Sequence, residues 1–169
     1  YHSELGYYSS ARERIGKEGD YYTSPYVHQA FGEILARFIA KGAGLIGDAN
    51  FDVIEFGGGG GLLASDILES IKREHTDVYD RMHYHIVEQS PRRRSEAEKS
   101  LEKHEHKLSF LASLSESGKE KIYGLVISNE FVDALAFHRA KFADGELLEI
   151  YVALKKDEFV ELTDKPSSN

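Results

Sequence analysis

The sequence predicts an α/β fold built on a parallel, Rossmann-like sheet, and three observations carry this prediction. The apolar run Val53–Phe56 reads as a short strand and ends in five consecutive glycines, Gly57–Gly61. Apolar residues at helical spacing follow the glycines directly. Strand-like and helix-like runs then alternate as far as about residue 128. A strand, a glycine turn and a helix in this order bring bare main chain close to a nucleotide.

Each expected element has a recognisable beginning or end. A hydroxyl cap followed by proline, Thr23-Ser24-Pro25, predicts the start of a helix that should stop near Gly42 and Gly44. A second helix is expected from about Gly61 to Glu74, and Ser90-Pro91 should begin a third, strongly charged one. The parallel strands are expected at 51–56, 83–88, 108–111 and 122–128.

The C-terminal part reads differently, as antiparallel strands. Residues 137–142 and 147–155 flank the turn Ala143-Asp144-Gly145, which predicts a hairpin, and 158–162 add a third strand. We therefore expect an N-terminal arm at 1–22, an α/β domain at 23–162 and a polar tail at 163–169. The parallel sheet would then be truncated after its fourth strand, and the hairpin would follow it.

Composition excludes several classes of function. A chain of 169 residues without cysteine suits one domain and has no thiol catalysis, disulfide or cysteine-type zinc site. The net charge of −8 argues against a nucleic-acid partner, which would require a basic face. No apolar run is long enough to span a bilayer, so no membrane partner is expected. The acidic balance leaves room for a cationic substrate.

The glycine turn is the first candidate site. Glu55, Gly57, Gly59 and Gly61 fit the pattern Glu-x-Gly-x-Gly-x-Gly, which is the first motif of class I S-adenosylmethionine-dependent methyltransferases. The run Gly59-x-Gly61-x-x-Ala64 also satisfies the nicotinamide dinucleotide fingerprint, although its first glycine lies late after the strand. A flexible turn without a ligand is the third interpretation.

Two further groups of polar residues follow later strands. Glu88 ends the second strand, where a carboxylate can accept two hydrogen bonds from a ribose diol, or can be simply solvated. Asn129, Glu130 and Asp133 follow the apolar strand 122–128. Glu130 and Asp133 are three residues apart, so a helical turn would put both on one side, where they could grip a guanidinium. The alternative is that Asp133 caps a helix while Glu130 is solvated.

Other charged clusters carry less weight. His83 and His85 alternate, as do His104 and His106, which on strands would place each pair on one face. No third ligand stands at a convincing spacing, so we predict no metal. The run Arg92-Arg93-Arg94 is expected to be a solvated helix face.

Four ordered blocks together resemble one protein family. They are Gly19–Pro25 with its Thr23-Ser24-Pro25 end, the glycine turn, Val87–Pro91 and Asn129–Leu135. In this order they closely resemble the MidA family of S-adenosylmethionine-dependent methyltransferases. The mitochondrial member of that family is an assembly factor for respiratory complex I that methylates an arginine of a complex I subunit.

The resemblance implies a class I methyltransferase sheet and S-adenosyl-L-methionine as cofactor. It implies that Gly57, Gly59 and Gly61 line the cofactor behind Glu55 and that Glu88 holds its ribose. It also implies that Thr23, Ser24 and Pro25 fold over the cofactor site. Asn129, Glu130 and Asp133 would border the transferring methyl, with an arginine side chain of a protein as substrate.

This chain departs from the family in three respects. The family usually has proline where Gly58 stands and a larger residue where Gly60 stands, which predicts a looser loop here. Family members are about twice as long, so we expect a fragment or a reduced homologue. A non-catalytic assembly chaperone therefore stays open beside the enzyme, and a nicotinamide-dependent oxidoreductase is a third reading. The expected location is the mitochondrial matrix in a eukaryote and the cytoplasm in a bacterium.

Overall fold

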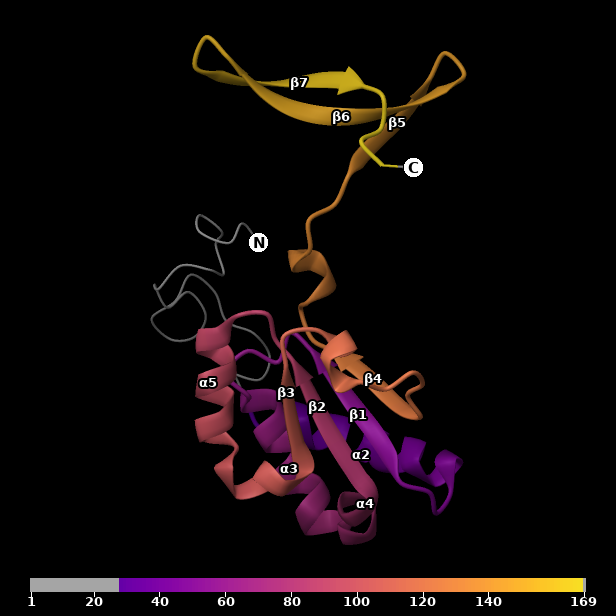
Figure 1. Ribbon diagram of the computed structural model, residues 1–169, viewed down its shortest axis with the longest axis vertical. Coiled ribbons are helices and arrows are strands. Elements are labelled where there is room, and N and C mark those ends of the chain that lie inside the picture. The colour runs from indigo at the N-terminus through magenta and orange to yellow at the C-terminus, as the bar shows by residue number, and fades with distance from the viewer. Residues whose placement is uncertain (1–27, 169) are drawn as a thin grey trace. The chain divides into compact units, whose positions relative to one another are not determined.

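A computed structural model describes residues 28–168, and the chain divides into two compact units, the first ending at Ala134 and the second beginning at Leu135. The first unit is a four-stranded parallel sheet with helices against one face (Figure 1). The second is a three-stranded antiparallel sheet. The α/β prediction with a C-terminal antiparallel hairpin is therefore confirmed.

The elements of the first unit alternate as the sequence predicted. Its strands are β1 (Phe51–Phe56), β2 (Met82–Val87), β3 (Leu108–Leu111) and β4 (Gly124–Ser128), in the spatial order β3-β2-β1-β4. Its helices are α2 (Ala30–Ile46), α3 (Leu62–Glu74), α4 (Thr76–Arg81) and α5 (Pro91–Ser100). Short 3₁₀ turns are η2 (Glu102–Lys107), η3 (Leu114–Ser117) and η4 (Val132–Ala134).

The main core lies between the helices and one face of the sheet. Val53, Tyr84 and Ile86 point from the strands toward Ile39 of α2 and Ile67 of α3, and all five are at most 1 % exposed. Alternate residues of the same strands point to the other face, where Ile54, Val87 and Leu111 form a smaller cluster. Strand alternation thus decides which side chains support the helices and which do not.

Helix α2 runs past its expected end, and its expected start at Thr23-Ser24-Pro25 lies outside the described residues. It begins at Ala30, where the imidazole Nδ1 of His28 accepts the backbone N–H of Ala30 at 2.9 Å. It runs on to Ile46, through both of the glycines that were expected to end it. Within the helix, position 42 favours glycine because a Cβ there would lie 2.6 Å from Leu125 on β4. The glycine gives close helix-to-sheet packing, and Gly47 ends the helix instead.

Three short elements, α4, η2 and η3, were not expected. Helix α4 has six residues and a polar sequence, so its periodicity is too short to read. His104 and His106 lie on η2 and not on a strand, so the argument from strand alternation was wrong for this pair. His104 is buried and its Nδ1 lies 2.7 Å from the Tyr79 hydroxyl.

The second unit is a meander of β5 (Arg139–Ala143), β6 (Glu146–Lys155) and β7 (Glu158–Asp164). Strand β7 extends to Asp164, into the stretch expected to be a polar tail. The buried carboxylate of Glu149 anchors the chain beyond β7, accepting the backbone N–H of Ser167 at 2.7 Å and its hydroxyl at 2.9 Å. Together with the His138 imidazole and the Tyr151 hydroxyl, these donors lower the pKa of Glu149 to about 2.

Candidate functional site

The candidate site lies at the carboxyl edge of the parallel sheet. Ladder hydrogen bonds continue past the strands, from the N–H of Gly57 to the carbonyl of Val87 at 2.9 Å and from the N–H of Glu88 to the carbonyl of Leu111 at 2.9 Å. Phe56 pairs with Ser128, so the segment after β4 leaves the sheet beside the end of β1. All three sequence-predicted groups therefore begin at one edge, where parallel sheets bind ligands.

The glycine loop takes backbone angles that only glycine adopts easily. Gly57, Gly59 and Gly61 have φ of 72°, 55° and 83°, in the left-handed region. These are the three glycines of the predicted motif, while Gly58 and Gly60 lie outside that region. The N–H of Gly61 donates to the carbonyl of Gly58 at 3.0 Å, which closes the turn before α3.

Close contacts add a second reason for glycine at two of these positions. A Cβ on Gly57 would lie 2.7 Å from the ring of Phe131, and one on Gly61 would lie 2.8 Å from Leu101 and 3.2 Å from the Cα of Ala97. A Cβ on Gly60 would meet nothing nearer than 3.8 Å. Three positions of the loop are thus fixed by conformation, whereas Gly60 is not required by its surroundings.

Glu88 joins the glycine loop to the start of α5. Its Oε2 accepts the backbone N–H of Gly59 at 3.1 Å, and its Oε1 accepts the backbone N–H of Ser90 at 2.8 Å. Ser90 in turn caps α5 through the N–H of Arg93, as its sequence predicted. A carboxylate offers about four acceptor positions, so capacity remains for hydroxyl groups of a ligand.

Glu55 lies beneath the loop and not on its surface. Its side chain is only 3 % exposed and its Oε2 accepts the hydroxyl of Tyr84, itself fully buried, at 2.9 Å. Burial raises the pKa of Glu55 to about 7, and the negative charge of Glu88 adds to the rise while the Tyr84 bond opposes it. The Cδ of Glu55 would stand 3.4 Å from a Cβ on Gly58. The same Cβ would stand 2.7 Å from Cγ2 of Ile86, so these two buried side chains lie close to the loop at Gly58.

The segment after β4 contacts the glycine loop through the aromatic ring of Phe131. Phe131 stacks on Phe56, with ring centroids 5.7 Å apart and planes inclined by 28°. Asn129 is half-buried, whereas Glu130 and Asp133 are exposed. Glu130 has a φ of 48° and precedes the 3₁₀ turn Val132–Ala134, so the helical-spacing argument for a shared side does not apply to this pair.

Two further sequence predictions concern the Thr23-Ser24-Pro25 segment and the arginine run of α5. Thr23, Ser24 and Pro25 lie outside the described residues. The arginine run of α5 was expected to be a solvated face, and this is wrong for two of its members. Arg94 donates to the carbonyls of Glu88 at 2.6 Å and Gln89 at 3.0 Å, and Arg93 lies 3.4 Å from where a Cβ of Gly59 would be. Only Arg92 is exposed, paired with Glu96.

Sequence reasoning missed Tyr84, Phe131 and Arg94, and a signal existed for the arginine. Cations in the first turn of a helix oppose its dipole, so a first-turn arginine needs a nearby acceptor. Nothing in local sequence marks Tyr84 as the partner of Glu55, because the contact joins two different strands.

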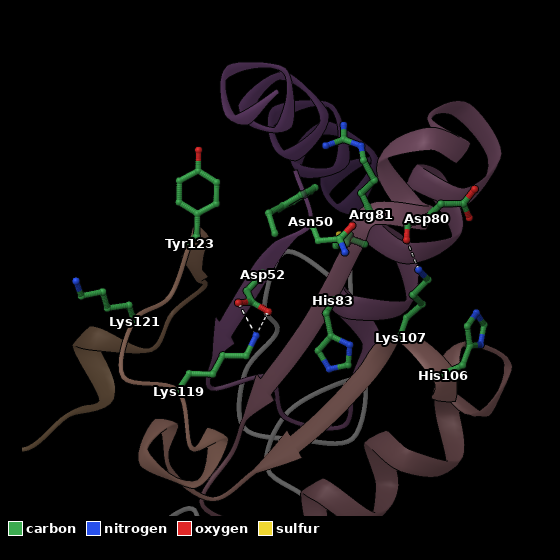
Figure 2. Close-up of a pocket in the computed structure, with 12 residues that line it drawn as sticks. Asn50, Asp52, Asp80, Arg81, His83, His106, Lys107, Lys119, Lys121 and Tyr123 are labelled. Atoms are coloured by element: carbon green, nitrogen blue, oxygen red, sulfur yellow. Dashed lines mark hydrogen bonds and ion pairs between the residues drawn. The ribbon is translucent and has the colours of Figure 1, made fainter. Parts of the chain in front are cut away.

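A pocket of about 360 Å³ opens at the opposite, amino edge of the sheet (Figure 2). Asp52 at its rim is held by Lys119 through both carboxylate oxygens and by His85 at 2.9 Å. Burial alone would raise the pKa of Asp52, but the bonds and charges of these two partners lower it overall. Within residues 28–168 no three histidine or carboxylate side chains are grouped as a metal would need.

The fold and the edge geometry define a nucleotide-binding α/β protein of the Rossmann-like class. A family sequence model described as "Putative S-adenosyl-L-methionine-dependent methyltransferase" matches residues 34–169. The chain belongs to this family, and its cofactor is S-adenosyl-L-methionine. The MidA resemblance read from the four sequence blocks is thereby confirmed, and the nicotinamide reading of Gly59–Ala64 loses its support.

Curated relatives carry more specific names. A Drosophila melanogaster protein named protein arginine methyltransferase NDUFAF7 homolog, mitochondrial, is 28% identical over 168 residues, which cover 88% of this chain and 38% of that protein. The Bos taurus protein arginine methyltransferase NDUFAF7, mitochondrial, is 28% identical over 158 residues, covering 79% and 35%. The chain thus spans less than half the length of the relatives it matches.

A solved structure agrees with the fold. A COG1565 superfamily member from Burkholderia thailandensis, bound to S-adenosyl-homocysteine, superposes with a TM-score of 0.79. The match covers 100% of this chain and 44% of that one at 24% identity. Among the described residues no helix is both long enough and apolar enough to cross a membrane.

Proposed function

We propose that this chain carries the cofactor site of a protein-arginine N-methyltransferase that acts in the assembly of respiratory complex I. The observation that carries the proposal is the convergence at one sheet edge of a glycine loop with three left-handed residues, the Glu88 carboxylate and the Asn129–Asp133 segment. The substrate class and the complex I role rest on the family resemblance and the names of the relatives.

The residues of the loop fit an adenosine-bearing cofactor. Gly57–Gly61 carry no side chains of their own, and a Cβ on Gly60 would meet no atom nearer than 3.8 Å, so a ligand can approach the main chain closely there. Glu88 has spare acceptor capacity for the two hydroxyls of a ribose. Glu55 lies close to the same loop at Gly58, and Thr23-Ser24-Pro25 stay candidates for a cover over it.

When bound, S-adenosylmethionine supplies a methyl group already activated on a sulfonium. The chain then has to exclude water and align an acceptor nitrogen for in-line transfer. A guanidinium is cationic and a poor nucleophile, so carboxylates that accept its N–H groups orient it and enrich one nitrogen in electron density. We assign this role to Glu130 and Asp133, and we assign to Asn129 the positioning of cofactor or substrate.

The test separates turnover from cofactor binding. Glu130→Gln keeps the size of the side chain and removes its charge, so methyl transfer from labelled S-adenosylmethionine to an arginine peptide should fall at least about tenfold. Cofactor affinity measured by isothermal titration should stay close to that of the unaltered chain. A parallel loss of cofactor affinity would show that Glu130 contacts the cofactor and that its role is misassigned.

The same titration decides between the enzyme and a chaperone. Heat of binding from S-adenosylmethionine supports the cofactor site, and its absence at high cofactor concentration supports a non-catalytic assembly protein. For location we propose the mitochondrial matrix in a eukaryote, in keeping with the mitochondrial names of the animal relatives, and the cytoplasm in a bacterium.

A further inference from the structure

The ring of Phe131 is wedged between two parts of the candidate site. On one side its Cδ2 atom is 2.7 Å from where a Cβ of Gly57 would stand, so the ring rests directly on the main chain of the glycine loop. Below, it stacks on Phe56, the last residue of β1, at 5.7 Å between centroids. A side chain larger than hydrogen at position 57 would displace the ring.

The backbone around Phe131 is shaped to deliver the ring to that place. Glu130 adopts a φ of 48°, which is uncommon for a residue with a side chain and costs of order 1 kcal/mol. The chain therefore turns sharply between the end of β4 and Phe131. The N–H of Ala134 then donates to the carbonyl of Phe131 at 3.2 Å, which closes the turn that contains Asp133.

The two candidate acidic groups have no comparable anchor of their own. The side chains of Glu130 and Asp133 are exposed, and no hydrogen bond or ion pair holds either one among the described residues. The partly buried ring of Phe131 lies between them in sequence and contacts the loop. The distance of the two carboxylates from the glycine loop is thus set largely by how this ring packs.

We infer that Phe131 is a positioning residue that couples the cofactor loop to the acidic segment bearing Glu130 and Asp133. The inference rests on the proposed function, because it assumes that the cofactor seats on Gly57–Gly61. A shift of Gly57 changes the contact on which the ring rests, and the hydrogen bond from the N–H of Ala134 to the carbonyl of Phe131 ties the ring's backbone to the turn at Val132–Ala134. Loading of the cofactor site is therefore transmitted to the acceptor site.

Backbone amide NMR on the full 169-residue chain tests this coupling with S-adenosyl-homocysteine as the probe. In the unaltered protein, titration should shift the amides of Gly57–Gly61 and also those of Glu130–Ala134. In Phe131→Leu, which keeps apolar bulk without a ring, the loop amides should still shift while those of Glu130–Ala134 lose most of their response. Phe131→Tyr, which restores the ring, should restore the response.

Phe110→Leu is the matched control, because Phe110 is a partly buried ring on β3 that packs against the main core, and β2 and β1 separate β3 from β4 and the acidic segment that follows it. The Phe110→Leu variant should be less stable than the unaltered protein, but the amides of Glu130–Ala134 should still shift when S-adenosyl-homocysteine is added. A full response in Phe131→Leu would overturn the coupling. Absence of any shift at Gly57–Gly61 in the unaltered protein would instead overturn the proposed cofactor site.

Discussion

The two edges of the parallel sheet differ in which groups they expose: main chain at the carboxyl edge and charged side chains at the amino edge. At the carboxyl edge the chain presents main chain, three left-handed glycines and a carboxylate that still has acceptor positions to offer. At the amino edge the carboxylate of Asp52 is already occupied by the side chains of Lys119 and His85. The glycines and Glu88 follow their strands, whereas Asp52 and His85 lie within β1 and β2 and only Lys119 comes from a connecting segment. The comparison teaches that a cofactor site can be recognised by main chain without side chains and by hydrogen-bond acceptors that the protein itself does not fully use.

The largest effect on stability is expected from adding a methyl group at Gly61 in the carboxyl-edge loop. Gly61→Ala forces a side chain into a φ of 83° and against Leu101 and the main chain of Ala97. Left-handed strain and overpacking together should lower the free energy of unfolding by about 2–4 kcal/mol. Urea denaturation measures the loss, and titration with S-adenosylmethionine should show weaker binding. Unchanged stability would mean that the loop does not need the conformation described.

The pH dependence of stability tests the carboxylate beneath the loop. Glu55 has a pKa of about 7 in the folded chain against an ordinary value of 4.5, so the folded state holds its proton more tightly than the unfolded state does. Stability should therefore fall as pH rises from about 4.5 to about 7, by up to about 3 kcal/mol.

Glu55→Gln is neutral at every pH and keeps an oxygen that can accept the Tyr84 hydroxyl. It should remove this particular dependence, so that the difference between variant and unaltered protein grows across the same pH interval. Denaturant titrations at about pH 4 and about pH 8, on either side of the expected transition, provide the comparison. Parallel curves for the two proteins would show that Glu55 titrates normally and is not buried as described.

At the amino edge the effect should be smaller and confined to stability. Lys119→Met removes a half-exposed partner of the buried Asp52 carboxylate, which keeps only its bond from His85. Because the lysine is partly solvated, we expect a loss of about 1 kcal/mol. Affinity for S-adenosylmethionine should not change, because Asp52 lies at the opposite end of β1 from the glycine loop. A drop in affinity would show that the two edges are not independent.

The smallest change is expected at the one loop glycine that its surroundings do not require. Gly60→Ala adds a methyl group with no atom closer than 3.8 Å and without left-handed strain. It should stabilise the chain by about 0.4–1 kcal/mol, because alanine restricts the unfolded chain more than glycine does. Thermal unfolding beside Gly61→Ala makes a matched pair, and equal destabilisation of both would contradict the loop geometry.

Much of the first unit could be predicted because its signals are local. The strand 51–56, the helix after the glycines and the cap of α5 at Ser90 depend on short-range periodicity and hydrogen bonds, and they are where the sequence placed them. The C-terminal end of α2 was mispredicted because tertiary contacts override local signals. Gly42 reads as a stop, but it is a packing position against Leu125.

The sequence predicted that the candidate site lies at the carboxyl edge of the sheet, but it did not predict the side-chain contacts within the site. Positive φ at Gly57, Gly59 and Gly61 follows the motif, since glycine adopts that conformation at little cost. The bond from Tyr84 to Glu55 and the packing of Phe131 on Gly57 join residues 29 and more apart in sequence. Contacts of that kind depend on strand order, which local pattern does not specify.

The most direct test of the account is to soak S-adenosyl-homocysteine into crystals of the chain and locate it. The account predicts density over Gly57–Gly61, with the ribose hydroxyls within hydrogen-bond distance of Glu88. Density only in the pocket at the amino edge, around Asp52 and Lys119, would contradict it, as would no density at saturating ligand.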